Sequence, residues 1–206
     1  GRGDCGFESH QAPKKMDWSE YLENTKNRKP TPLLIAALSE IPRNGVALDI
    51  GIGAGVDTRA IAAHGLIVDA VDPSPEVVAY ISAHSDGLPI HVFQTGIENF
   101  SIIENQYDLI FAWYSLPFIK NEEKYMTVLE RIRSGLKNEG HFLASVFGED
   151  EPYVKESGLT RIKKEKLVEI FKDFEIKTIK EIKDTHADAA GNIKDWHRIV
   201  IHARKP

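Results

Sequence analysis

Cysteine and long apolar runs are almost missing from this sequence of 206 residues. Its one cysteine, Cys5, cannot form an internal disulfide, and no cluster of Cys and His has the spacing of a zinc site. No apolar run is long enough to span a bilayer, and residues 1–15 lack the apolar core of a signal peptide. We therefore expect a cytoplasmic protein with no membrane partner and no metal, and a disordered leader over residues 1–15.

Positive charge is also scarce, because 26 Lys and Arg residues face 31 Asp and Glu residues, which gives a net charge of -5. A protein that neutralises phosphate backbones needs a basic face, so nucleic acid is not expected as a partner. The lysines between Lys163 and Lys183 alternate with acidic residues, which is typical of a solvated surface. The length predicts a single domain over residues 16–206, acting as a monomer or homodimer on a small molecule.

Apolar runs alternate with amphipathic stretches along the chain, which predicts an α/β fold with a mostly parallel sheet and helices on both faces. The predicted strands cover residues 46–50, 67–72, 89–95, 108–115 and 141–147. The predicted helices cover residues 56–64, 75–84 and 121–137, with a further helical stripe from Leu167 to Phe174.

Both ends of the chain depart from this alternation. Residues 174–185 and 196–204 read as two long strands with only a polar turn between them, so they should pair antiparallel at a sheet edge. Near the start, residues 17–27 place Trp18 and Tyr21 on one helix face before a break at residues 30–32. We expect this helix to lie over the sheet edge as a lid.

Three alternate glycines follow the first predicted strand, in the segment Asp49-Ile50-Gly51-Ile52-Gly53-Ala54-Gly55-Val56. Glycine permits a sharp turn and a close approach of ligand to backbone, and the following helix offers unpaired N–H groups. A dinucleotide fingerprint needs its third glycine where Val56 stands, so a pyrophosphate is disfavoured.

Acidic residues end the first two strands. Asp49 would repel a pyrophosphate but suits a ligand that carries an ammonium and a sulfonium. Asp72 lies 21 residues after Gly51, where a carboxylate can accept hydrogen bonds from both ribose hydroxyls. The two strand ends together predict a site for a cationic nucleoside.

With these features the sequence resembles the class I S-adenosylmethionine-dependent methyltransferases from about Trp18 onward. Later motifs support this, namely Tyr107-Asp108-Leu109-Ile110-Phe111-Ala112-Trp113-Tyr114 and Leu136-Lys137-Asn138-Glu139-Gly140-His141-Phe142. The resemblance implies a Rossmann-like sheet of seven strands with an antiparallel terminal strand. It also implies cofactor contacts, with the methionine part on Gly51, Gly53 and Gly55, the ribose on Asp72, adenine beside Pro73, Ile97 and Glu98, and Trp113 along the cofactor.

The sequence departs from that family at two positions. Gly96 replaces an acidic residue often found in the third motif, so the adenine amino group needs another acceptor. Asn138 replaces a usual proline, but asparagine is also compatible with a turn.

A narrower resemblance rests on Trp196-His197, Trp18-x-x-Tyr21 and Arg28-Lys29-Pro30. These are similar to segments of a bacterial subgroup of small methyltransferases related to tellurite-type and thiopurine-type enzymes. By that analogy Arg28 pairs with the cofactor carboxylate, since guanidinium binds carboxylates in a bidentate manner.

The predicted reaction passes an activated sulfonium methyl to a nucleophile that the protein aligns and shields from water. His197 is the candidate general base, and Tyr114 is the second candidate catalytic residue. Tyr114 could instead pack at a strand end, and His197 could be a hydrogen-bonded strand residue. Two other functions stay open, a nicotinamide-dependent oxidoreductase and a module that binds S-adenosylmethionine without chemistry.

Overall fold

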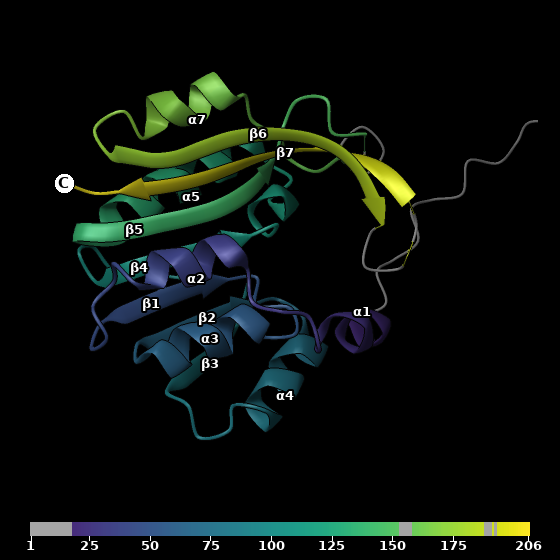
Figure 1. Cartoon of the computed structure of the whole chain (residues 1–206), viewed down its shortest axis with the longest axis vertical. Coiled ribbons are helices and arrows are strands. Elements are labelled where there is room, and N and C mark those ends of the chain that lie inside the picture. Colours follow the sequence, from purple (N-terminus) through teal and green to yellow (C-terminus); the bar gives the residue numbers. More distant parts are fainter. Residues whose placement is uncertain (1–17, 153–157, 188–190, 192) are drawn as a thin grey trace, which may run out of the picture.

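The computed structural model describes residues 18–152, 158–187, 191 and 193–206, so the leader predicted over residues 1–15 lies outside the described residues. One sheet of seven strands runs through the molecule in the order β3-β2-β1-β4-β5-β7-β6 (Figure 1). The strands are β1 (Val46–Ile50), β2 (Ile67–Asp72), β3 (Ile90–Gln94), β4 (Tyr107–Trp113), β5 (Leu136–Phe147), β6 (Glu175–Ala187) and β7 (Ile193–Arg204).

The first five strands pair in parallel with one another, whereas the last strand runs in the opposite direction to its neighbours. β7 lies between β5 and β6 and is antiparallel to both, which leaves β6 at the edge of the sheet. The predicted α/β fold with an antiparallel terminal strand is therefore confirmed. The hairpin is longer than predicted, because pairing extends to Ala187 on one strand and begins at Ile193 on the other.

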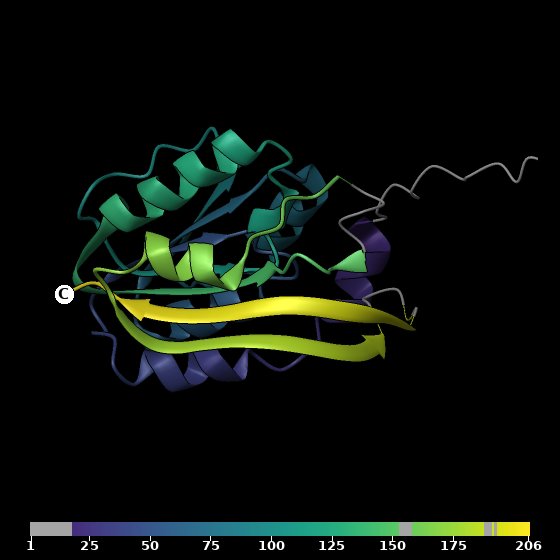
Figure 2. The same ribbon diagram turned by 90° about the horizontal axis from the view of Figure 1, so that it is seen from above.

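Helices cover both faces of the sheet (Figure 2). They are α1 (Trp18–Thr25), α2 (Pro32–Leu38), α3 (Val56–His64), α4 (Pro75–Ala83), α5 (Glu122–Gly135) and α7 (Lys164–Ile170), with a short 3-10 helix η1 (Leu116–Phe118). α5 and α7 pack on one face through a core that includes Leu129, Phe142 and Phe171. The helices α2, α3 and α4 pack on the other face around residues such as Leu34, Ile61 and Leu143.

Local signals fix where the helices on the two faces begin. The Ser74 hydroxyl accepts a hydrogen bond from the Val77 amide at 3.3 Å, and Pro75 occupies the first turn of α4. On α5, the Asn121 side chain accepts from the Lys124 amide at 2.8 Å. Both helices therefore start where the sequence predicted, and their apolar sides face the sheet.

The sequence prediction missed α2 altogether. Residues 30–32 were read only as a break, but Pro32 occupies the first turn of a new helix. Proline is favoured there because its missing N–H would be unpaired in any case. Leu34, Ala37 and Leu38 of this helix are buried against the sheet.

α1 lies beside the carboxyl ends of the parallel strands and next to α4 (Figure 1). The site built from those strand ends therefore has a helix from the start of the chain against it. Among the described residues, no helix is both long and apolar enough to cross a bilayer.

Candidate functional site

The glycine turn connects β1 to α3 in a conformation that other residues rarely adopt. Gly51, Gly53 and Gly55 have φ angles of 74°, 49° and 68°. A Cβ atom on Gly51 would lie 2.3 Å from the Cβ of Ser115, so the turn is packed against the end of β4 as well as strained for a side chain. The three predicted glycines thus form one tight backbone loop at the carboxyl edge of the sheet.

Two buried carboxylates border this loop, one at the end of β1 and one at the end of β2. Asp49 is 3% exposed and accepts a hydrogen bond from the Thr58 hydroxyl at 2.6 Å. Burial raises the pKa of Asp49 to about 7, although the bond from Thr58 opposes the rise. No ion pair joins Asp49 to a cation within the described part of the chain.

Asp72 is held against the same loop. Its Oδ1 accepts a hydrogen bond from the Ser74 amide at 2.9 Å. Burial raises the pKa of Asp72, while the backbone N–H groups of Ser74, Gly53 and Ile52 lower it. The carboxylate is therefore fixed beside the glycine turn by amides rather than by a cation, and it can still accept hydrogen bonds from a ligand.

Arg28 reaches this edge from the segment between α1 and α2. Its Nη2 lies 2.5 Å from Oδ2 of Asp57, a buried residue in the first turn of α3. The Thr31 amide donates to the other oxygen of Asp57 at 2.7 Å. Arg28 also lowers the pKa of Asp49 and of Tyr21, which places the guanidinium near both. In this structure Arg28 is thus paired with Asp57 at the mouth of the site.

Tyr21 of α1 lies over the glycine turn. The position of a Cβ atom on Gly53 would be 3.2 Å from the Tyr21 hydroxyl oxygen. Burial raises the pKa of Tyr21, Arg28 lowers it and Asp72 raises it. Trp18 packs edge-on against the ring with centroids 5.5 Å apart. The sequence predicted that Tyr21 lies on the helix expected to form a lid, but it did not predict a contact with the cofactor loop.

The other predicted cofactor residues line the neighbouring strand ends. Pro73 is exposed directly after Asp72, and Ile97 is 6% exposed within the core. Glu98 is exposed, and its Oε2 lies 2.6 Å from where a Cβ atom of Gly96 would stand. A carboxylate therefore occupies the space beside Gly96 although residue 96 itself has none.

Trp113 is the last residue of β4, and Tyr114 follows it. The Trp113 ring is half-buried and lies parallel to Phe111, with centroids 5.8 Å apart. Tyr114 has a φ of 59°, which is rare for an aromatic residue, and its amide donates to the Ser145 carbonyl at 3.1 Å. Its hydroxyl oxygen lies 2.5 Å from Nη1 of Arg198, a residue that the sequence did not single out.

His197 is hydrogen-bonded through both nitrogens of its ring. The Asp150 amide donates to its Nδ1 at 2.9 Å, so Nε2 bears the hydrogen and donates to Glu181 at 2.7 Å. The side chain is buried, and its ring lies against Gly148. Both ring nitrogens are therefore engaged in bonds that join β7 to β6 and to the segment after β5.

A cavity of about 420 Å³ lies elsewhere, between α2 and the β6–β7 hairpin. It is lined by residues that include Leu33, Ala36, Thr178 and His202, and by the Lys177–Glu40 ion pair. Its walls contain neither the glycine turn nor an acidic strand end. We place the functional site at the glycine turn, because the groups that suit a nucleoside gather there. Within the described residues, no three potential metal ligands come together.

Comparison with known proteins adds a family to this geometry. Residues 47–140 match the family model described as a methyltransferase domain. No curated protein matches the sequence. The matched segment begins within β1, contains the glycine turn and Asp72, and ends within β5.

Solved structures of low sequence identity share the fold. TehB from Haemophilus influenzae superposes with a TM-score of 0.73 at 22% identity. The match covers 85% of this chain but only 62% of the TehB chain. The 1,6-didemethyltoxoflavin-N1-methyltransferase of Burkholderia thailandensis, with bound 1,6-didemethyltoxoflavin and S-adenosylhomocysteine, gives a TM-score of 0.62 at 24% identity, covering 92% of this chain and 79% of that one.

A third structure is the N-methyltransferase NodS from Bradyrhizobium japonicum in complex with S-adenosylhomocysteine. Its TM-score is 0.63 at 17% identity, and the superposition covers 93% of this chain and 100% of the NodS chain. At these identities the likeness establishes a common fold.

Proposed function

We propose that the protein transfers the methyl group of S-adenosylmethionine to a small-molecule nucleophile, because residues 47–140 match the family model of a methyltransferase domain. The observation that supports this most is the pair of buried carboxylates, Asp49 and Asp72, that border a glycine turn without a cation of their own. A ligand with an ammonium and a sulfonium supplies the missing positive charge.

The residues present fit such a ligand along its length. The turn of Gly51, Gly53 and Gly55 offers backbone without side chains to the methionine part, and the Arg28 guanidinium suits its carboxylate. Asp72 accepts the ribose hydroxyls, with Pro73, Ile97 and Trp113 beside the adenosine. Glu98 takes the part of the acid that Gly96 lacks and accepts the adenine amino group.

The buried hydroxyl of Ser115 is a further sign of a ligand at this edge. Its Oγ has no hydrogen-bond partner among the described residues and would lie 3.1 Å from a Cβ atom on Gly51. Buried polar groups are rarely left unpaired unless something else completes them. A bound methionine moiety would offer this hydroxyl a partner.

When bound, S-adenosylmethionine supplies a methyl group that is already activated by positive sulfur. The work left to the protein is to align the acceptor, exclude water and keep the charge of the site balanced. Tyr21 covers the glycine turn from α1 and shields it from solvent. Tyr114 follows β4 and is bonded to Arg198, and His197 joins β7 to β6 and to the segment after β5.

The wider setting is also part of the proposal. We take residues 16–206 as one methyltransferase domain with α1 as its lid, acting as a monomer or homodimer in the cytoplasm. Tyr21 over Gly53 supports the lid, and the single sheet of the described residues supports one domain.

Calorimetric titration with S-adenosylhomocysteine tests the site. We expect micromolar binding to the unaltered protein and loss of detectable binding in Asp72→Asn, which keeps the size of the side chain but weakens it as an acceptor of two hydroxyls. Asp108→Asn is the matched control, since Asp108 stands at the amino end of β4, paired with Lys137 at 2.7 Å. Retained affinity in Asp72→Asn removes the assignment.

Two further titrations separate the rival functions. NADH bound in preference to S-adenosylhomocysteine identifies a nicotinamide-dependent oxidoreductase, which the proposal excludes because Asp49 opposes a pyrophosphate. Labelled S-adenosylmethionine incubated with a panel of amines, phenols and thiols tests for turnover. Tight binding with no methylated product from any of them identifies a non-catalytic module instead.

A further inference from the structure

Tyr114 is held in a strained backbone conformation at the edge where β4 meets the glycine turn. Its φ of 59° is an outlier for a bulky residue, and such outliers gather at functional sites. A hydrogen bond of 3.1 Å from its amide to the Ser145 carbonyl holds this conformation. The next residue, Ser115, packs against Gly51. Tyr114 is therefore anchored by the cofactor loop on one side and by β5 on the other.

Arg198 of β7 sets the direction of the Tyr114 hydroxyl. Its guanidinium can only donate, so the tyrosine oxygen accepts at 2.5 Å, and the hydroxyl hydrogen must point elsewhere. No second described group bonds to that hydroxyl. Asp184 holds the other end of the guanidinium. Tyr114 thus presents a hydroxyl that is free to donate to a ligand, and the adjacent cation strengthens it as a donor.

Aromatic rings surround this hydroxyl, together with the guanidinium of Arg198. Lys194 also lies nearby, with its Nζ 5.3 Å from the centroid of the Trp196 ring. Tyr114, Phe147 and Trp196 form a triangle of rings with centroids 6.2 to 6.3 Å apart. Leu159 is buried in the same cluster. The charge of Arg198 is balanced by Asp184, and Asp49 and Asp72 make the cofactor side acidic. An anionic acceptor would meet no unpaired cation at this edge among the described residues.

His197 is not a free base beside Tyr114. Both ring nitrogens of His197 are engaged, and His186 stacks on Trp196 with its Nδ1 3.3 Å from Asp184. His197 is therefore not available to take a proton from the acceptor, whereas Nε2 of His186 has no hydrogen-bond partner among the described residues.

We propose that the methyl acceptor is a neutral, largely apolar small molecule with a hydrogen-bond-accepting oxygen or nitrogen, and that this atom accepts the hydrogen bond of the Tyr114 hydroxyl. Arg198 is a positioning residue that acts through Tyr114. This inference rests on the proposed methyl transfer, because the Tyr114 hydroxyl matters only if an acceptor lies beside the cofactor turn.

Three ring compounds of similar size test the class of acceptor on the complex with S-adenosylhomocysteine. Acetophenone has a carbonyl that can only accept, toluene lacks it, and benzoate adds a negative charge. By saturation-transfer NMR titration we expect acetophenone to bind about three- to tenfold more tightly than toluene, as one hydrogen bond allows, and benzoate to bind no better than toluene.

The variants then locate the cause. Tyr114→Phe removes the hydroxyl and keeps the ring, so the preference for acetophenone over toluene should fall to about onefold. Arg198→Met should lose the same preference, Arg198→Lys should restore part of it, and the double variant with Tyr114→Phe should lose nothing more. A merely structural role of Arg198 would weaken acetophenone and toluene equally.

Arg204→Met is the matched control, because Arg204 lies on the same strand and is also ion-paired, with Glu175 at 3.2 Å. A preference for acetophenone that survives in Tyr114→Phe overturns the inference, as does tightest binding of benzoate or no binding of acetophenone. The prior titration with S-adenosylhomocysteine keeps the two proposals apart. Its failure counts against methyl transfer, whereas its success with an unchanged probe preference counts only against the role of Tyr114.

Discussion

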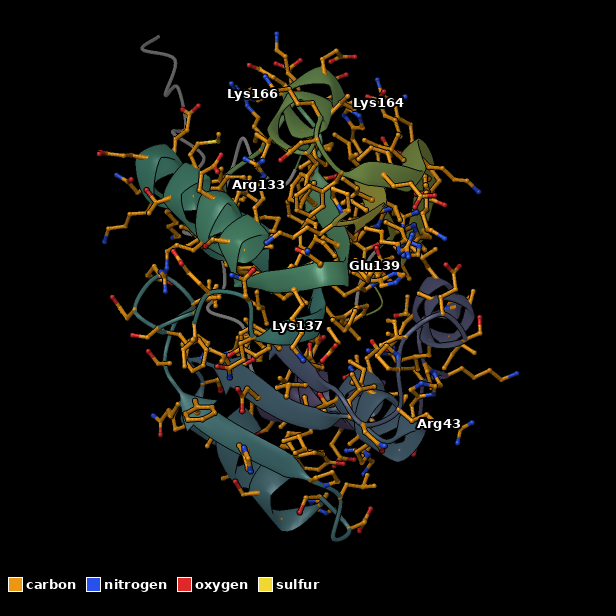
Figure 3. The ribbon with its side chains drawn as sticks, turned by 90° about the vertical axis from the view of Figure 1, so that its left-hand side faces the viewer. Arg43, Arg133, Lys137, Glu139, Lys164 and Lys166 are labelled. Atoms are coloured by element: carbon orange, nitrogen blue, oxygen red, sulfur yellow. The ribbon has the colours of Figure 1, made fainter. Side chains whose placement is uncertain are left out.

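The two ends of the sheet carry acidic residues in opposite states. At the amino end, carboxylates are paired with cations, as Asp108 is with Lys137 at 2.7 Å and Asp173 with Arg133 at 2.6 Å. Figure 3 views the molecule from this end, where Arg133 and Lys137 are labelled along with Glu139, which pairs with Arg204. At the carboxyl end, Asp49 and Asp72 are buried, and burial raises their pKa values.

The difference separates carboxylates that stabilise the fold from carboxylates that serve ligand binding. Exposed ion pairs at the amino end each contribute little to the free energy of unfolding, about 0 to 1 kcal/mol, and need nothing more. Buried acids without a counter-ion are unfavourable in the folded protein until a ligand compensates them. The acids at the carboxyl end therefore lower the stability of the free protein, and ligand binding can restore it. The ion pairs at the amino end have no such dependence on a ligand.

The change with the largest expected effect introduces a side chain into the glycine turn. Gly51→Ala would force a side chain into a φ of 74° and into contact with Ser115, so we expect a loss of about 2–4 kcal/mol in the free energy of unfolding and no binding of S-adenosylhomocysteine. Gly87→Ala is the control, because its φ of 73° is similar but no atom lies within 4 Å of the new Cβ. Its loss should stay near 1 kcal/mol with binding intact. Equal losses from the two changes would contradict this reading of the turn.

Acid should act on a buried histidine pair toward the amino end. His141 Nδ1 and His202 Nε2 lie 2.8 Å apart, and burial lowers both pKa values, that of His202 to about 4. The unfolded chain takes up protons first as pH falls below 6.5, so stability is lost from there down to about pH 4.

The measurement is urea unfolding at pH 7.5 and pH 4.5 for the unaltered protein and for His202→Asn. The unaltered protein should lose about 2 kcal/mol more than the variant between these two pH values. The same pH dependence in both proteins would show that the histidine pair is not the source.

Asp49 should respond to pH through the ligand rather than through folding. Its folded pKa of about 7 lies above its ordinary value, so the protonated form persists in the free protein up to neutral pH. A cationic ligand needs the ionised form, and we expect the affinity for S-adenosylmethionine to rise up to about tenfold between pH 6 and pH 8. Calorimetry at both pH values should give a nearly flat profile in Asp49→Asn, and a slope that persists in the variant would place the titration elsewhere.

The smallest expected effect concerns a buried hydroxyl away from either end. Tyr125 on α5 is fully buried, and its hydroxyl has no hydrogen-bond partner among the described residues. Tyr125→Phe should be neutral or stabilise the protein by up to about 1 kcal/mol in thermal unfolding. Tyr107→Phe, which removes the bond to Asp69 at 3.1 Å, should instead destabilise by about 1 kcal/mol. A clear loss of stability in Tyr125→Phe would mean that its hydroxyl has a partner after all.

What the sequence predicted well was local. The glycine turn, the strands around it and the acid at the end of β2 are encoded within 27 consecutive residues, from Val46 to Asp72, so spacing alone located them. The caps at Ser74 and Asn121 were readable for the same reason. α2 was missed because a proline was taken as the end of a helix when it begins one.

What the sequence could not predict depends on contacts between distant segments. Tyr114 and Arg198 are 84 residues apart, and only the position of β7 beside β5 brings them together. The engaged nitrogens of His197 likewise depend on Glu181 across the hairpin and on Asp150 after β5. The Glu98 carboxylate beside Gly96 follows from a backbone turn that spacing does not reveal.

A crystal structure of the protein grown with S-adenosylhomocysteine tests the central claim most directly. The account predicts density along the glycine turn, with the ribose hydroxyls on Asp72 and Tyr21 closed over the ligand. Density in the cavity between α2 and the β6–β7 hairpin instead, or an empty glycine turn at saturating ligand, would contradict it.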